Sequence, residues 1–200
     1  MKSVIRAVLL ASGLACIGAA GQAQTYQVFL SGPNESPPNA SPGVGQGFVT
    51  VDPLANTLRV QVSFTGLLGT TTASHIHAAT ATPFTGTAGV ATTTPTFAGF
   101  PLGVTSGTYD SGLLDMTSAT SYNPAYITAN GGTPVSAEAA LFSAIASGRS
   151  YLNIHSSVVP GGEIRGFLVA TPEPGSVALF VSLGASLPLI ARRRRRARIS

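Results

Sequence analysis

Three histidines are the residues of this chain whose type and spacing could do chemistry. His75 and His77 flank Ile76, and residues two apart in a strand point to the same face of a sheet. If that strand lies beside the one that carries His155, three imidazoles converge, as in zinc or copper sites that keep an open position. The alternative is structural, because a buried imidazole in a sheet donates to a backbone carbonyl or to a carboxylate such as Glu163. The H-x-H pattern does not separate the two, and the structural role, without a cofactor, is the commoner.

Other catalytic arrangements are missing from the sequence. It contains no Ser-His-Asp order, no glycine-rich phosphate loop and no cysteine–histidine pair. The single cysteine, Cys16, lies in an N-terminal apolar run, so the mature chain is expected to lack a disulfide. A bimetallic redox site needs more imidazoles than three. The sequence therefore predicts no catalytic residues and no enzyme.

A hairpin near the end of the chain must position the third histidine. Two strands, Tyr151–His155 and Glu163–Leu168, are predicted on either side of a turn that contains Pro160 and two glycines. Alternation places Tyr151, Asn153 and His155 on one face of the first strand. It also places Glu163 beside Arg165 on the second, where the two could form a salt bridge that holds the hairpin.

The rest of the central region is predicted to be mostly strands. Period-two alternation is clearest over residues 58–64, and shorter apolar runs indicate the other strands. The predicted strands are 26–30, 48–52, 58–64, 73–78, 89–93 and 105–114. Residues 117–133 are expected to be an irregular insertion. One helix is predicted from Ser136, its cap, to Gly148, with an apolar face formed by Leu141, Phe142 and Ile145.

Three ordered motifs carry a resemblance to a known family. The closing stretch YLNIH…PGGEIRGFL, the opening stretch YQVFLSGPNESPP and the HIH between them resemble the chordin (CHRD) domain family over about residues 25–170. The resemblance implies an all-β fold, an immunoglobulin-like or superoxide-dismutase-like antiparallel β-sandwich with one short helix. It also implies a structural motif made of Asn34, Glu35, Tyr151, Asn153, His155, Gly161, Gly162, Glu163, Arg165 and Gly166.

The two ends of the chain indicate export. Residues 1–23 combine a basic start, an apolar run and a Gly-Gln-Ala site, which predicts a secretory signal peptide cleaved after Ala23. Residues 171–200 contain Pro172-Glu173-Pro174, seventeen uncharged residues and a terminal arginine cluster. This tail resembles the PEP-CTERM sorting signal of Gram-negative envelope proteins. It implies a C-terminal transmembrane helix and recognition by an exosortase-type membrane peptidase, the alternative being a permanent anchor.

Charge and composition narrow the function. Only 9% of residues are charged, and residues 24–171 contain three arginines and six carboxylates. This region is therefore mildly acidic, and a nucleic-acid partner is not expected.

Residues 24–170 are predicted to form one domain between the signal peptide and the tail. The favoured function is an exported, non-enzymatic module of the cell envelope, cell surface or extracellular matrix that binds an unidentified macromolecule. It would be held in the membrane by its C-terminal helix before processing. The alternative is a zinc- or copper-binding domain with redox or hydrolytic activity through His75, His77 and His155.

Overall fold

Alternating burial along three long strands sets the architecture. The structure is a computed structural model that describes residues 22–172. In β3 (Thr57–Thr65), Leu58, Val60, Val62 and Phe64 are buried while the residues between them are not. β1 (Gln24–Ser31) and β2 (Val44–Asp52) pair with full register in an antiparallel meander with β3. One face of this meander therefore forms half of the core.

The strands form one antiparallel sheet in the order β4-β7-β8-β1-β2-β3-β5. The short strands β6 and β9 pair outside this path with β3 and β1. The remaining strands are β4 (Thr71–Ala78), β5 (Gly107–Asp110), β6 (Leu114–Asp115), β7 (Ser150–Ser156), β8 (Ile164–Phe167) and β9 (Val169–Ala170). The hairpin predicted around Pro160 is thus confirmed as β7–β8, and the HIH strand β4 is its neighbour.

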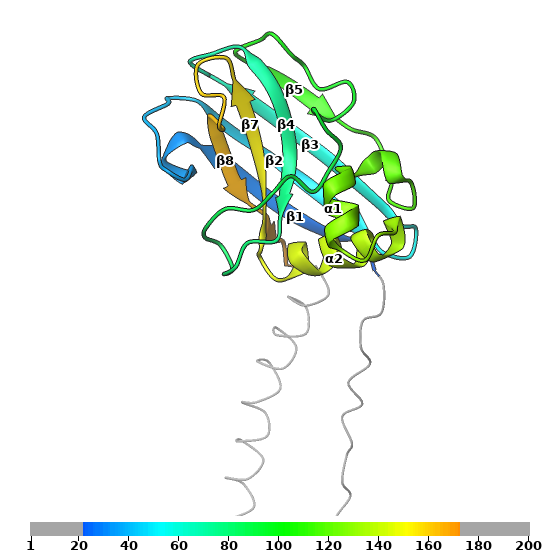
Figure 1. The fold of residues 1–200 in the computed structure, drawn as a ribbon. Helices are drawn as coiled ribbons and strands as arrows, with labels where there is room; N and C mark the ends of the chain where they lie inside the picture. Colours follow the sequence, from blue (N-terminus) through cyan, green and yellow to red (C-terminus); the bar gives the residue numbers. More distant parts are fainter. Residues whose placement is uncertain (1–21, 173–200) are drawn as a thin grey trace, which may run out of the picture.

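The all-β prediction is confirmed, but the sheet is a curled half-barrel rather than a sandwich of two separate sheets. β1 joins the two halves, because it pairs with β2 along one edge and with β8 and β9 along the other. Figure 1 shows β4 and β7 crossing over β2 and β3. Right-handed twist accumulates along such a sheet until its apolar faces meet. Leu152, Ile154 and Ile76 from one half contact the core formed by β1–β3.

The predicted helix is α2 (Pro134–Ala146), and its start differs from the expectation. The cap is Thr133, whose side chain accepts from the Ser136 backbone N–H, while Ser136 occupies the third helical position of a capping box. Pro134 fits the first turn because its missing N–H is not needed there. The helix buries Leu141 and Ile145, whereas Phe142 is only partly buried. Gly148 ends it at φ +69°, as expected.

The segment between β4 and α2 departs most from the predictions. Residues 89–93 do not form a strand, since only isolated bridges connect His77 with Val90 and Thr92 with Tyr122. The predicted strand 105–114 is divided into β5 and β6. Residues 117–133 are not irregular, because they contain α1 (Pro124–Ala129), capped by Asn123. Residues 22–172 also contain two short 3₁₀ turns, η1 (Gly32–Asn34) and η2 (Ala119–Ser121).

The ends of the described chain lie side by side. Thr171 donates its backbone N–H and its hydroxyl to the Thr25 carbonyl, and the Gln24 amide donates to the Thr171 carbonyl. Within residues 22–172 no helix is long and apolar enough to cross a membrane. Residues 1–21 of the predicted signal peptide, with Cys16, and the tail from Glu173 onward, with its proposed transmembrane helix, lie outside the described residues.

Candidate metal centre

Three histidines from two adjacent strands meet on the outer face of the curled sheet. In the β4–β7 pairing His75 lies opposite Asn153, His77 opposite Tyr151, and Ala73 opposite His155. All three imidazoles therefore lie on one face, and one ring nitrogen of each lies within 4.8 Å of the others. The centroid of the His75 ring is 5.8 Å from that of His77 and 5.2 Å from that of His155. The convergence predicted from sequence is present.

Each imidazole is fixed by a backbone carbonyl from outside its own strand. His75 Nε2 lies 2.5 Å from the Pro95 oxygen, and His77 Nδ1 lies 2.9 Å from the Ala88 oxygen. His155 Nδ1 lies 2.9 Å from the Pro160 oxygen. A carbonyl can only accept, so each of these nitrogens carries the hydrogen. In a neutral ring the opposite nitrogen then presents a bare lone pair.

Those opposite nitrogens have no partner. His75 Nδ1, His77 Nε2 and His155 Nε2 are buried, and nothing within residues 22–172 donates to them. A buried acceptor without a hydrogen bond costs about 1–3 kcal/mol of stability. Three such nitrogens in one cluster form a donor set that a metal ion would satisfy. The carbonyl bonds on the other nitrogens would then select the tautomer and orientation of each ligand.

Burial keeps the three rings neutral. It lowers the pKa of His77 to about 4, with a smaller effect from the charges of its neighbours. Burial also lowers the pKa of His75 and of His155 below the ordinary value. The lone pairs are therefore free of protons at neutral pH, as metal binding requires.

A stack of π systems leads away from the cluster. The Tyr151 ring lies parallel to that of His77, with centroids 4.8 Å apart. On its other side, the Arg165 guanidinium lies 4.7 Å from the Tyr151 centroid. The Tyr151 hydroxyl shares the Ala88 carbonyl with His77. Tyr151 therefore fixes the orientation of His77 without contributing a charged group.

Arg165 and Glu163 do not form the predicted salt bridge. The Arg165 guanidinium instead donates to the Asn34 and Gly86 carbonyls and lies 3.7 Å from the Glu35 carboxylate. These partners come from loops that sequence spacing could not locate. Burial raises the pKa of Glu35 to about 7, against the opposing effect of Arg165.

The Glu163 carboxylate joins three connections of the fold. It accepts from the Ser41 hydroxyl at 2.6 Å, from the Leu68 N–H at 2.5 Å and from the Gly69 N–H at 3.2 Å. The side chain is completely buried. Burial would raise its pKa, but the hydrogen bonds that it accepts outweigh this and lower the pKa. Glu163 is thus a structural carboxylate outside the histidine cluster.

The glycines of the motif allow close packing around this face. Gly162 has φ +131°, and a Cβ there would stand 2.5 Å from the Asn153 amide nitrogen. A Cβ at Gly166 would collide with the Phe29 carbonyl, whereas one at Gly161 would meet nothing within 4 Å. Asn34, although predicted within the motif, contributes its backbone oxygen to Arg165. The motif residues other than Gly161 therefore have packing or hydrogen-bonding roles.

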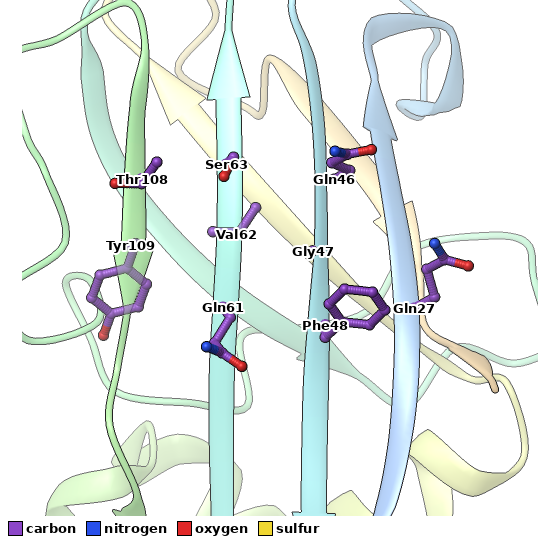
Figure 2. A pocket seen from close by; sticks show the side chains of 9 residues that line it. All are labelled: Gln27, Gln46, Gly47, Phe48, Gln61, Val62, Ser63, Thr108 and Tyr109. Carbon is purple, nitrogen blue, oxygen red and sulfur yellow. The ribbon is translucent and has the colours of Figure 1, made fainter. Parts of the chain in front are cut away.

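Several hollows lie outside the histidine cluster. One of about 570 Å³ lies beside Arg165 and Glu35, with Phe29, Phe84 and Phe167 among its walls. A second, of about 490 Å³, lies over the ends of β1, β2 and β3. Another, of about 470 Å³, is on the outer face of β1, β2, β3 and β5. Figure 2 shows Gln27, Gln46 and Gln61 along it, with Phe48 between neighbouring strands. Its lining contains amides and hydroxyls but no carboxylate or imidazole.

Comparison with known proteins adds the relationship of the whole domain. No curated protein and no solved structure matches the chain. The CHRD domain model matches residues 26–168, a range that contains the opening motif, all three histidines and the β7–β8 hairpin. This match covers well over half of the 200 residues, and the chain therefore belongs to the CHRD domain family.

Proposed function

We propose that this chain is an exported envelope module that holds one transition-metal ion through His75, His77 and His155. The observation that carries the proposal is the convergence of three imidazoles, with one ring nitrogen of each within 4.8 Å of the others and a buried, unpartnered nitrogen in every ring. A purely structural histidine needs its second nitrogen to be solvated or bonded. Here the second nitrogen is left without a partner in all three rings, and this favours metal binding over the structural role that the sequence alone suggested.

The residues around the cluster have distinct roles in this proposal. The Pro95, Ala88 and Pro160 carbonyls fix the three tautomers, and Tyr151 holds the His77 ring by stacking. The bound ion would link β4 to β7 and to the segment that carries Ala88 and Pro95. We therefore propose a metal-dependent binding module without catalytic activity.

The family and the two chain ends support the proposed location in the envelope. The CHRD domain is an extracellular type of domain with a binding role, which suits the envelope or the extracellular matrix. Removal of residues 1–23 and sorting of the tail by an exosortase-type membrane peptidase complete the proposal. The unidentified macromolecular partner belongs to it as well. Removal of residues 1–23 has a direct test, since the N-terminal sequence of the envelope form should begin at Gln24.

Metal analysis of the purified full chain tests the site. We expect about one zinc or copper ion per chain after loading and desalting, and its loss in His75→Ala, His77→Ala and His155→Ala. The matched control is Tyr151→Phe, which keeps the stacked ring and removes only the hydroxyl, so it should retain the ion. Circular dichroism checks that each variant folds. A folded wild type that binds neither metal would contradict the proposal.

Thermal stability gives a second test of metal binding that does not require metal analysis. An ion that binds only the folded state, at a hundredfold excess over its Kd, stabilises by about 2.7 kcal/mol. The melting temperature of the wild type should therefore rise on metal addition, while that of each histidine variant stays constant. An equal rise in the wild type and in all three variants would indicate binding elsewhere.

A further inference from the structure

We infer that the three-histidine site selects Cu(I) over Zn(II), an inference that rests on the proposed metal site. The first observation is the donor set, which contains three neutral imidazoles. No carboxylate or thiolate of residues 22–172 joins this cluster. Glu163 is occupied by Ser41 and by the Leu68 and Gly69 amides, and the Glu35 carboxylate lies beside Arg165. The site thus supplies no negative charge to an incoming cation.

The electrostatic cost differs strongly between the two ions. The Born cost of moving an ion out of water scales with the square of its charge, so it is about four times larger for a dication than for a monocation. The Arg165 guanidinium lies 4.7 Å from the Tyr151 ring centroid, and the Tyr151 ring stacks on His77 with centroids 4.8 Å apart, so the nearest charged side chain on that side of the cluster is a cation. A buried site with three neutral ligands and no carboxylate among them therefore penalises Zn(II) more than Cu(I).

Coordination number acts in the same direction. Zinc in proteins is almost always four-coordinate, so three histidines leave it in need of a water or another ligand. The three unpartnered nitrogens are all buried away from solvent. Cu(I) is stable with two or three ligands and needs no water. Imidazole is a suitable ligand for both metals, so the charge and the coordination number of the ion decide which one binds more tightly.

Competition titrations of the purified full chain test the inference. Cu(I), kept reduced with ascorbate under anaerobic conditions, is titrated against bicinchoninate, and Zn(II) is titrated against a zinc-binding dye. We expect one Cu(I) per chain and an affinity at least ~100-fold tighter than for Zn(II), about 2.7 kcal/mol. The X-ray absorption edge should show three-coordinate Cu(I). Zn(II) binding as tight as Cu(I) would overturn the inference and leave the metal site intact, whereas binding of neither ion overturns both.

A charge-introducing variant tests the physical reason. His155→Asp replaces the least buried of the three imidazoles by a carboxylate, which should lower the affinity ratio of Cu(I) to Zn(II) at least tenfold. The control Ser157→Asp adds the same charge at an exposed position two residues away, outside the cluster, and should leave the ratio unchanged. Circular dichroism confirms folding of both variants. An unchanged ratio in a folded His155→Asp protein that still binds metal would contradict the electrostatic argument.

Discussion

At the scale of single residues, Glu163 holds separate connections of the fold together through the hydrogen bonds that its carboxylate accepts. Its carboxylate receives hydrogen bonds from the β1–β2 connection, through Ser41, and from the β3–β4 turn, through Leu68 and Gly69. Hydrogen bonds to a charged group are each worth about 1.5–3 kcal/mol. One buried side chain thus connects the β7–β8 turn, in which it lies, to the β1–β2 connection and to the β3–β4 turn.

Replacing Glu163 should destabilise the domain. Glu163→Gln loses the charge and one acceptor, so we expect a melting temperature lower by roughly 5 °C or more. The control is Glu138→Gln in α2, another buried carboxyl, for which no hydrogen bond of its side chain is found within residues 22–172. Its melting temperature should stay the same or rise. Equal losses in the two variants would show that burial rather than hydrogen bonding is responsible.

The histidine cluster should make the metal-free protein sensitive to acid. Burial lowers the folded-state pKa values, so the unfolded chain binds more protons and stability falls as pH drops below about 6.5. For His77 the loss continues down to its folded pKa of about 4. Melting temperatures of the chelator-treated protein between pH 7 and pH 4 measure the slope. His77→Asn should show a shallower slope than the wild type, and an identical slope would contradict the argument.

The sequence located the three imidazoles but not the groups that fix them. His75 and His77 could be assigned to one face because strand alternation is a local rule. The Ala88 and Pro95 carbonyls flank residues 89–93, which were predicted to be a strand but form only isolated bridges, so the pattern there did not indicate where the backbone turns. The Glu163–Arg165 pairing failed for the same reason, since the partners of both residues come from connections far away in sequence.

At the scale of elements, the long strands were predictable, whereas the strand predicted at 89–93, the division of 105–114 and the boundaries of the helices were not. Period two in 58–64 became β3, because one face of that strand is buried along its whole length. Ser136 was expected to cap α2, but Thr133 followed by Pro134 offers both a hydroxyl acceptor and a preset backbone angle. α1 was missed because its six residues are too few to show a period.

The end of α2 gives a prediction at this scale. Gly148 has φ +69°, and a Cβ there would collide with the Phe84 ring. An L-residue in the left-handed region costs about 1–2 kcal/mol, so Gly148→Ala should lower the melting temperature by several degrees. Gly161→Ala is the control, because a Cβ at Gly161 meets nothing within 4 Å. Equal stabilities of the two variants would argue against the helix end described here.

At the scale of the whole molecule, one curled sheet replaces the two-sheet sandwich that the family resemblance suggested. The sequence could not distinguish the two, since both bury the same alternate residues. The difference depends on whether β1 pairs on both of its edges, and it does so through Ser31–Arg165, Tyr26–Ala170 and Gln27–Val169.

The pairing of β9 with β1 indicates which residues the smallest stable fragment must contain. A fragment spanning residues 24–172 should be soluble and unfold in one cooperative transition by circular dichroism and calorimetry. A shorter fragment that ends at Leu168 loses β9 and the bonds of Thr171 to Thr25, and should melt at a lower temperature. Aggregation of the 24–172 fragment would show that residues beyond it are part of the fold.

Because the two ends of residues 22–172 lie side by side, the domain is a candidate for circular permutation. Since Gln24 and Thr171 are already hydrogen-bonded, a short glycine linker could join them without strain. New ends could then be opened at the β2–β3 turn, where Leu54 is exposed. A circular permutant of this kind would keep every strand pairing. For the same reason the whole domain could be inserted into a surface loop of a host protein, carrying with it the three histidines that are proposed to bind a metal.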